Sequence, residues 1–370
     1  MASSKHPLHA LCPYFAMFPH TFVRRHLFAL TRPGDVILDP FSGRGTTLLE
    51  SLLLDRKALA VDINPVAACV TGAKAHVPTL PAIESRLDEL KRHCRETGWQ
   101  EVDEERRALP SFFAYAFHYW TMRELLFIRR HLDWDHSEID RFIAALVLGS
   151  LHGEMDKSRS YFSNQMPRTI STKPAYSIRY WRKHGLRPKR RRVFEILRNR
   201  ARFRLQNGRP SHTGMALQAD VRETSRLLGS WRGRVRAIIT SPPYLNVTNF
   251  EEDQWLRLWF LGGPPRPTSG RISKDDRHTG AKGYWRFLSE AWQGVAGLLA
   301  KHGFIVCRVG GKRQSLDSLA HGMVATVRSA FPSAELVFGP FASSLVQRQT
   351  DNFRPGTAGC SVEADFVFRT

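Results

Sequence analysis

The chain has 370 residues, 42% of them hydrophobic, which allows one large folded domain or two moderate ones. Its formal net charge of +21 predicts a polyanionic partner, and nucleic acid is favoured over an acidic membrane surface. No stretch approaches the roughly 20 apolar residues of a membrane span, and the N-terminal segment lacks the apolar core of a secretory signal. We therefore expect a cytoplasmic protein without membrane contact.

The cysteines are scattered and form no CxxC pair; they are Cys12, Cys69, Cys94, Cys307 and Cys360. This spacing predicts neither a disulfide framework nor a zinc site, and we expect no metal. Reduced thiols in or near the core are the expectation.

The N-terminal part has a βαβ pattern. The apolar run from Asp35 to Asp39 predicts a short buried strand, and the segment from Thr46 to Leu54 predicts a helix. A second strand is predicted from Ala58 to Asp62 and a second helix from Pro65 to Ala75.

The turn after the first predicted strand suits a cofactor. Gly43 and Gly45 allow backbone to approach a ligand closely, and the amides that open the next helix, beside Thr46 and Thr47, suit a carboxylate. A dinucleotide is the alternative ligand of such a turn, but Leu48 stands where its fingerprint has the third glycine.

Acids close two of the predicted strands. Asp62, about 20 residues beyond the glycine turn, is placed to bind ribose hydroxyls. Asp220 closes a later strand and could accept a hydrogen bond from an adenine amino group. A helix N-cap or a surface acid is the alternative for Asp220.

The pattern changes between about 80 and 212, where the periodicity is helical and the later part is strongly basic. Between Arg179 and Arg204 twelve Lys or Arg residues accompany one acid, Glu195. A solvated helical face would normally mix the two signs, so this run predicts phosphate contacts. The residues assigned to these contacts are Arg182, Lys183, Lys189, Arg190, Arg191, Arg192 and Arg198.

Two polar stretches are candidates for contact with nucleic-acid bases. The stretch from Asp156 to Gln165 has side chains suited to base edges. The stretch from Pro264 to Gly283 lies beyond the predicted strand that ends at Thr240 and could close over a base. The alternative for the first stretch is a loop packed on the rest of the fold, and the alternative for the second is a plain connection.

The strand pattern returns in the last part of the chain, with one helix predicted from Tyr284 to Lys301. The final two strands are expected at an antiparallel edge of the sheet. The predicted strands are Met215 to Asp220, Arg236 to Thr240, Gly303 to Arg308, Glu335 to Phe338 and Val362 to Phe368.

The segment Ser241-Pro242-Pro243-Tyr244 directly follows the strand that ends at Thr240. Two consecutive prolines cannot continue a helix or donate to a sheet ladder, so they fix a rigid, extended backbone whose carbonyls can accept hydrogen bonds. Beside an aromatic ring, such a segment suits a flat ring that bears an amino group. A turn that merely ends a strand is the alternative for an isolated motif of this kind.

Together these motifs resemble the S-adenosylmethionine-dependent amino-methyltransferases of DNA, the N4-cytosine and N6-adenine enzymes of restriction-modification systems. The resemblance covers residues 8–78 and 213–370, and it rests on the glycine turn, Asp62 and the Thr-Ser-Pro-Pro-Tyr segment in that order. It implies that S-adenosyl-L-methionine is the cofactor. The implied cofactor-binding residues are Phe18, Pro19, Asp39, Pro40, Phe41, Gly43, Gly45, Thr46, Thr47, Asp62 and Asp220.

One residue departs from the family pattern. Arg44 stands where a small residue is common, which leaves open how the methionine end of the cofactor is held.

The resemblance also implies an α/β fold of the Rossmann-like class I methyltransferase type, with a seven-stranded, mostly parallel sheet and a helical, basic insert. Residues 1–80 and 213–370 would form the two halves of the methyltransferase domain, and the second half would carry the catalytic segment. Residues 81–212 would form the insert that recognises the DNA target.

The catalytic assignment covers Ser241, Pro242, Pro243 and Tyr244. Hydrogen bonds from a base amino group to the Ser241 hydroxyl and the Pro242 carbonyl would favour a pyramidal nitrogen, while Tyr244 stacks on a base flipped out of double-stranded DNA. In the family, serine at this position accompanies cytosine N4 and aspartate accompanies adenine N6. We therefore expect a site-specific, cytosine-N4 DNA methyltransferase, with adenine N6 as the alternative.

Two further alternatives come from other classes. A tRNA guanine-N2 methyltransferase shares the glycine turn but usually carries Asp-Pro-Pro-Tyr and an RNA-binding domain ahead of it, whereas only 38 residues precede Asp39 here. A catalytically silent nucleic-acid-binding module is the other. A cognate restriction endonuclease is a partner that the family suggests, and the sequence does not predict the oligomeric state.

Overall fold

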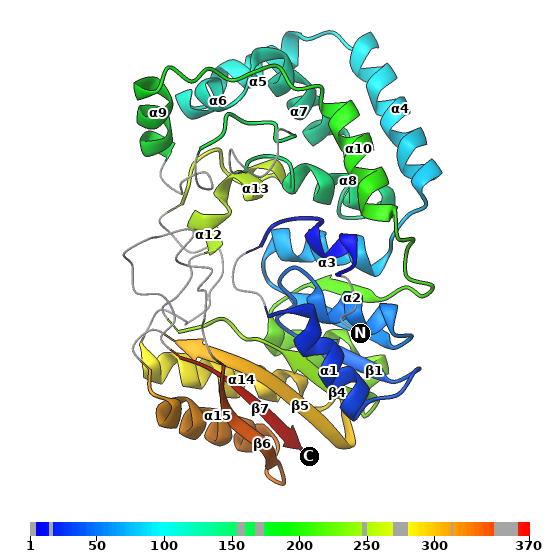
Figure 1. The fold of residues 1–370 in the computed structure, drawn as a ribbon, viewed down its shortest axis with the longest axis vertical. Helices are drawn as coiled ribbons and strands as arrows, with labels where there is room; N and C mark the ends of the chain where they lie inside the picture. The colour runs from blue at the N-terminus through cyan, green and yellow to red at the C-terminus, as the bar shows by residue number, and fades with distance from the viewer. Residues whose placement is uncertain are drawn as a thin grey trace. The chain divides into compact units, whose positions relative to one another are not determined.

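The computed structural model describes residues 5–14, 18–153, 160–166, 174–245, 250–268, 280–311, 314–343 and 362–370. The chain forms two compact units (Figure 1). The helical unit comprises Met1–Pro13, Val77–Arg209 and Asn249–Ile272, and the sheet unit comprises Tyr14–His76, Pro210–Thr248 and Ser273–Thr370.

The sheet unit is built around seven strands in its described residues. Their order is β3-β2-β1-β4-β5-β7-β6, and β7 runs in the opposite direction to the other six strands. This arrangement confirms the predicted fold class, a Rossmann-like α/β sheet of the class I methyltransferase type. The strands are β1 Val36–Asp39, β2 Lys57–Asp62, β3 Met215–Gln218, β4 Val235–Thr240, β5 Leu299–Gly311, β6 Glu335–Ser343 and β7 Val362–Arg369.

Helices connect and cover these strands. The helix after β2 begins where the sequence predicts it, because the Asn64 side chain accepts a 3.0 Å hydrogen bond from Val66 N and Pro65 occupies the first helical position. The α-helices of this unit are α1 His20–Leu30, α2 Thr46–Leu53, α3 Pro65–Ala75, α11 Thr224–Leu227, α14 Ala281–Ala296 and α15 Leu316–Ala330; η2 Val221–Glu223 and η3 Gly229–Trp231 are 3₁₀ turns.

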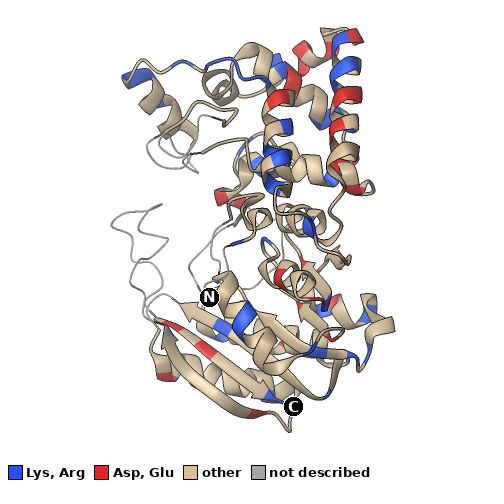
Figure 2. Ribbon diagram, turned by 45° about the vertical axis from the view of Figure 1, so that its right-hand side comes forward, with Lys and Arg blue, Asp and Glu red and all other residues tan. Residues whose placement is uncertain are grey.

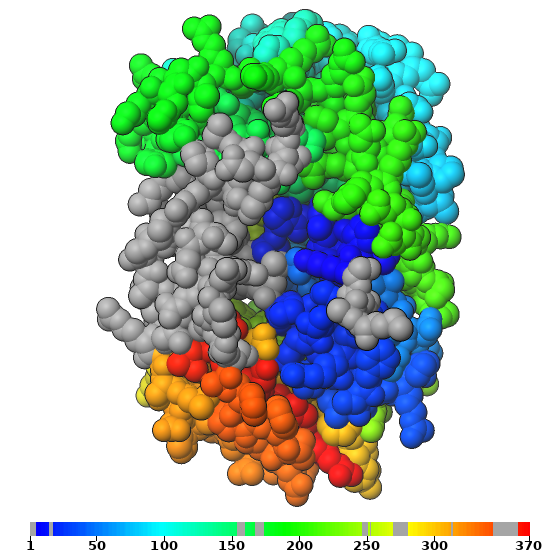
Figure 3. Space-filling model, viewed as in Figure 1, coloured from blue at the N-terminus to red at the C-terminus, as the bar shows by residue number. Residues whose placement is uncertain are grey.

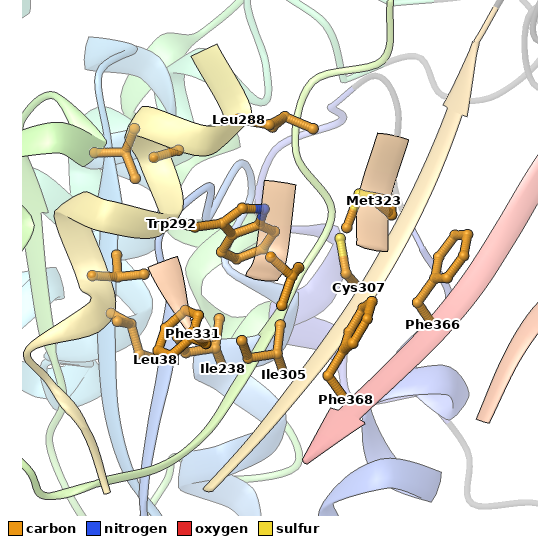
Figure 4. Close-up of a cluster of buried hydrophobic side chains, with 14 of the residues drawn as sticks. Leu38, Ile238, Leu288, Trp292, Ile305, Cys307, Met323, Phe331, Phe366 and Phe368 are labelled. Atoms are coloured by element: carbon orange, nitrogen blue, oxygen red, sulfur yellow. The ribbon is translucent and has the colours of Figure 1, made fainter. Parts of the chain in front are cut away.

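The central strands are buried on both faces, as expected for parallel strands covered by helices. On one face, Leu38 of β1 and Ile305 of β5 pack in a cluster with Trp292 of α14 and Phe366 of β7 (Figure 4). On the other face, residues of α1 pack in a second cluster against side chains of β1, β4 and β5. Along each strand these side chains alternate with the side chains of the first cluster. The sheet is therefore fixed from both sides, and its strand ends are held in a defined register.

The predicted end of the helix before β5 is wrong. The helix predicted from Tyr284 to Lys301 ends at Ala296, and β5 already begins at Leu299. Gly297 caps the helix, and Leu299 pairs with Val235 of β4. Long-range strand pairing thus overrides the helical periodicity of the last residues.

The helical unit contains no strand among its described residues. Its α-helices are α4 Leu80–Glu96, α5 Gln100–Ala108, α6 Ser111–Ala116, α7 Tyr119–His131, α8 Glu138–Leu148, α9 Pro174–Lys183, α10 Val193–Leu205, α12 Phe250–Asp253 and α13 Trp255–Phe260, and η1 Pro7–Ala10 is a 3₁₀ turn. None of the helices in the described part of the chain is long and apolar enough to cross a membrane.

Four cysteines, Cys12, Cys69, Cys94 and Cys307, are buried free thiols. Cys360 lies outside the described residues, as do parts of both predicted polar stretches, namely residues 156–159 and 269–279.

Candidate active site

The two sequence motifs meet at the carboxyl ends of β1 and β4. The Thr240 hydroxyl donates a 2.6 Å hydrogen bond to Asp39 Oδ1, and the backbone N–H of Phe41 donates to the same oxygen at 3.2 Å. The Thr47 hydroxyl donates to the carbonyl of Ile239 at 3.0 Å. The glycine turn is therefore joined directly to the strand that carries the Ser-Pro-Pro-Tyr segment.

Asp39 is 1% exposed, and its burial raises the pKa of its carboxyl group from 3.8 to about 6. The hydrogen bonds from Thr240 and from the backbone N–H of Phe41 act against this shift, because they favour the ionised form. The carboxyl group therefore links the end of β1 to the end of β4 and is almost completely buried.

Glycine is required at the turn for two reasons. Gly43 and Gly45 have φ values of +52° and +74°, which disfavour other residues. A Cβ on Gly45 would also lie 2.9 Å from Thr71 Oγ1 on α3. The turn is consequently both left-handed and packed closely against the neighbouring helix.

Asp62 fixes the turn from the end of β2. Its Oδ2 accepts a 2.8 Å hydrogen bond from Gly43 N, and its Oδ1 accepts one of 2.9 Å from Asn64 N. Carboxylate oxygens can each accept two hydrogen bonds, so this arrangement is compatible with a ligand hydroxyl as well. Sequence alone did not indicate the two backbone partners.

Arg44, the departure from the family pattern, is only 6% exposed. Its Nε donates to Thr46 Oγ1 at 3.2 Å, and its carbonyl accepts a hydrogen bond from the buried Lys74 ammonium group. The Arg44 side chain is therefore buried beside the glycine turn, where it is hydrogen-bonded to Thr46, and the Arg44 backbone is hydrogen-bonded to Lys74.

The Ser-Pro-Pro-Tyr segment follows β4 without regular secondary structure, and the next residue, Leu245, pairs with Gly311 at the end of β5. The Ser241 side chain is partly exposed, and no hydrogen bond joins it to another residue in the described part of the chain. Its hydroxyl is therefore available to a ligand.

Tyr244 is 9% exposed, and its hydroxyl is hydrogen-bonded to Glu363 of β7. Burial raises the pKa of the Glu363 carboxyl group. Two positions along the same strand, Asp365 pairs with Arg308 of β5 through contacts of 2.6 and 2.8 Å. The ring of Tyr244 is therefore positioned by the antiparallel edge of the sheet.

Sequence reasoning missed these partners of Tyr244. A signal was present, since Glu363 and Asp365 are two positions apart in an otherwise apolar predicted strand and hence lie on the same face. Buried carboxylates in a sheet need hydrogen-bond or ion-pair partners. This requirement is a sequence signal that Glu363 and Asp365 contact other side chains.

The remaining predicted cofactor residues have mixed surroundings. Phe41 is partly buried and contacts Phe287, with ring centroids 6.0 Å apart. Phe18 is 8% exposed and lies in the second core cluster, beside Phe22. Pro19 precedes α1 as its N-cap residue, and Pro40 is buried within the turn.

The predicted strand end at Asp220 is wrong, because β3 ends at Gln218. Asp220 is instead the N-cap residue of η2, which is the alternative that the sequence left open. Its side chain caps η2 by accepting a 2.9 Å hydrogen bond from Arg222 N, and it also pairs with the Arg222 guanidinium group at 2.6 Å. Burial opposes the ionised form, but the hydrogen bonds from Arg222 together outweigh it and lower the pKa of the carboxyl group. A role in adenine binding stays a prediction.

The basic residues assigned to phosphate contact belong to the helical unit. Arg182, Lys183, Lys189 and Arg190 are exposed, and α9 and α10, drawn in green, reach the surface of this unit (Figure 3). Arg192 pairs with Glu195 at 3.3 Å.

Helix α4 neutralises part of the basic run. Arg198 pairs with Asp88, and Arg202 pairs with Glu84 at 2.6 Å. Figure 2 shows acidic and basic residues on neighbouring helices of this unit. Charge counting along the sequence could not reveal these acids, because they come from a helix about 110 residues away.

Comparison with known proteins gives partial matches. A family model for N6/N4 methyltransferases, described as "DNA methylase", matches residues 2–70. Type II methyltransferase M.Cfr9I of Citrobacter freundii is 40% identical over 52 residues, which are 14% of this chain and 17% of that protein. Type II methyltransferase M.SmaI of Serratia marcescens is 41% identical over 51 residues, which are 14% of this chain and 18% of that protein.

The chain thus covers less than a fifth of the length of these two relatives. The matches support a DNA amino-methyltransferase and do not distinguish cytosine N4 from adenine N6. The rRNA methyltransferase aviRa of Streptomyces viridochromogenes has a TM-score of 0.37 and 13% identity, covering 100% of this chain and 94% of its own. The fold assignment rests on the strand order and not on that likeness.

Proposed function

We propose that this protein is a site-specific DNA methyltransferase that transfers a methyl group from S-adenosyl-L-methionine to N4 of a flipped cytosine. The observation that carries the proposal is the hydrogen bond from Thr240 to Asp39, which joins the glycine turn to the Ser-Pro-Pro-Tyr segment. A protein that methylates an amine needs a cofactor-binding site next to a site that holds the amine. The glycine turn supplies the first, and the Ser-Pro-Pro-Tyr segment supplies the second.

The residues around the glycine turn fit the proposed cofactor. The left-handed turn at Gly43 and Gly45 precedes α2, whose first backbone N–H groups lack intrahelical partners and suit a carboxylate. Asp62 at the end of β2 offers acceptors for ribose hydroxyls. When bound there, S-adenosyl-L-methionine supplies an electrophilic methyl group on a sulfonium centre.

The Ser-Pro-Pro-Tyr segment is suited to holding an amino group. The lone pair of an exocyclic amine is delocalised into the base, which makes the nitrogen a poor nucleophile. The Ser241 hydroxyl and the Pro242 carbonyl can each accept one of its hydrogen bonds and so favour a pyramidal nitrogen. Tyr244 offers a ring on which the base stacks, and positioning of this kind is a major source of rate acceleration.

Serine at position 241 favours cytosine N4 over adenine N6. The Type II designation of the two relatives supports a place for the protein beside a restriction endonuclease. The net charge of +21 and the exposed Arg182, Lys183, Lys189 and Arg190 support double-stranded DNA as the partner. Residues 81–212 serve in recognition of the target.

The test is expression in a bacterial host that lacks DNA methylation, followed by mass spectrometry of nucleosides from its digested genomic DNA. N4-methylcytosine that is present with the wild-type protein and absent with Ser241→Ala is the expected result. N6-methyladenine would keep the enzyme class and overturn the choice of base. If neither appears, the same assay on RNA decides whether the substrate is RNA or the protein only binds nucleic acid.

A further inference from the structure

The helical unit contains a cavity of about 390 Å³ that lies between α4, α7 and the start of α10. This volume falls in the range of roughly 300–1,000 Å³ that small-molecule sites occupy. The lining residues are Lys91, Cys94, Arg95, Trp99, Trp120, Glu124, Arg190, Arg192, Phe194 and Glu195. Nothing in the proposed methyl transfer uses this cavity, which we call the tryptophan pocket.

The walls of the tryptophan pocket combine flat rings with positive charge. Trp120 is 41% exposed although it is a large aromatic residue, and the Arg190 guanidinium group lies 5.6 Å from the centroid of its ring. Four cations and two acids line the pocket, so its net charge is positive. Neither Lys91 nor Arg95 forms a salt bridge with a residue in the described part of the chain. Lys91 interacts electrostatically with the Glu124 carboxyl group, whereas Arg95 is exposed and available to an anion.

The rings are held in place from behind. The Arg123 guanidinium group lies 4.9 Å from the ring centroids of both Trp99 and Trp120, and Arg123 Nε donates a 2.8 Å hydrogen bond to Asp103. The Tyr119 hydroxyl donates to the same carboxylate at 3.1 Å. The aromatic wall is therefore rigid before any ligand binds, which reduces the cost of binding.

The backbone beside Arg190 and Arg192, two of the lining residues, is also fixed. Thr121 Oγ1 on α7 accepts a 2.7 Å hydrogen bond from Arg191 N and donates one of 3.1 Å to Arg191 O. Two residues further, Val193 N donates to the Glu124 carboxylate at 2.9 Å. The backbone that carries Arg190 and Arg192 is thus attached to α7, and both arginines line the pocket.

From this geometry we infer that the tryptophan pocket binds one unstacked nucleotide. Its base stacks on Trp99 or Trp120, and its phosphate pairs with Lys91, Arg95 and Arg190. Bases stack on aromatic side chains whatever their sequence, and phosphates pair with Lys and Arg. The nucleotide is either an unpaired residue of bound DNA or a free mononucleotide. The first source extends the proposed function and rests on it, whereas binding itself is independent of methyl transfer.

The test measures binding without cofactor, so that a lack of methylation activity cannot affect it. A 20-base-pair duplex with a single bulged nucleotide is compared with the same duplex fully paired, and dAMP is titrated separately while tryptophan fluorescence is followed. Stacking of one base predicts a preference for the bulged duplex of roughly tenfold or more. Thermal melting confirms that each variant is folded.

The variants are chosen as matched pairs. Trp120→Ala removes the exposed wall at the start of α7, and its control Trp134→Ala makes the same change just beyond the end of that helix. Arg95→Ala removes a cation of the pocket, and its control Arg92→Ala removes an exposed arginine of the same helix that does not line the pocket. Tyr244→Ala serves as the control for the other base site.

A bulge preference that is lost in Trp120→Ala and Arg95→Ala, but kept in both controls and in Tyr244→Ala, supports an unstacked DNA nucleotide in the pocket. Quenching by dAMP that depends on Trp120, without a bulge preference, supports a free nucleotide instead. A preference that depends on Tyr244 and not on Trp120 assigns the effect to the catalytic segment and overturns the inference, as does the absence of both effects.

Discussion

Thr240 donates a hydrogen bond of 2.6 Å to Asp39, although the two residues are 201 positions apart in the chain. Both are buried, and each ends a strand of the same sheet, β4 and β1 respectively. The hydrogen bond places the first residue after β4, the predicted catalytic Ser241, in a fixed relation to the glycine turn. The contribution of this hydrogen bond to the stability of the fold and to function can be measured directly.

Replacement of Thr240 by Val keeps the shape of the side chain and removes the donor. We expect a loss of about 1–3 kcal/mol in the free energy of unfolding above pH 6, because the buried carboxylate loses a partner. The loss should be smaller below pH 6, where the Asp39 carboxyl group is protonated. Denaturant unfolding at pH 5 and pH 8 measures this. Thr240→Ser keeps the hydroxyl group and should resemble the wild type, and equal losses in both variants would contradict the role of the hydrogen bond.

Asp39→Asn tests the raised pKa. In the wild type the folded pKa of about 6 exceeds the unfolded value of 3.8, so the folded state binds more protons in this interval. The stability contributed by this group is therefore greatest below pH 4 and declines until about pH 6. Asn keeps an acceptor for Thr240 but does not titrate. The stability of the variant relative to the wild type should rise by roughly 2–3 kcal/mol between pH 4 and pH 7. Parallel stability curves would show that burial does not shift Asp39.

Gly45→Ala tests the close packing of the glycine turn. The added methyl group meets Thr71 at 2.9 Å and also requires φ of +74°. Gly233→Ala is a matched control, since its φ is +65° but nothing lies within 4 Å. We expect Gly45→Ala to lose at least about 1 kcal/mol more than the control in the free energy of unfolding. Calorimetric titration should show weaker S-adenosylmethionine binding only for Gly45→Ala, and equal effects would argue against close packing on Thr71.

The sequence predicted the strands and the glycine turn because both have local signals. Buried parallel strands appear as short apolar runs, and a left-handed turn needs Gly43 and Gly45 wherever the rest of the chain lies. The end of the helix before β5 was misplaced, because the pairing of Leu299 with Val235 depends on a strand far away in the sequence.

The side-chain partners that position the site were not predictable in the same way. Thr71 on α3, Glu363 on β7 and the acids of α4 act on residues of other elements, and an interaction between distant elements leaves no periodic signal. The basic run illustrates the consequence. Its charge is real in the sequence, but Asp88 neutralises Arg198 in the fold.

Tyr244 combines two features that substitution can separate. Tyr244→Ala removes the ring and should lose most methyl transfer while DNA binding is retained. Tyr244→Phe keeps the ring and removes only the hydrogen bond to Glu363, so it should retain much more activity than Tyr244→Ala. Methyl transfer to DNA and electrophoretic mobility shifts measure the two properties. Near-wild-type turnover of Tyr244→Ala would refute the stacking role.

The basic run gives a prediction about salt. Arg190→Glu combined with Arg191→Glu should weaken binding to every DNA sequence, because cations that pair with phosphates position the protein without reading bases. The slope of log K against log salt concentration should become shallower by about 1 for each phosphate that the variant no longer neutralises. Arg92→Glu combined with Arg107→Glu makes the same charge change at exposed arginines of the same unit outside the run, and it should leave the slope close to that of the wild type. Fluorescence anisotropy across a range of salt concentrations measures both. Unchanged binding in the first pair would remove this segment from the DNA interface.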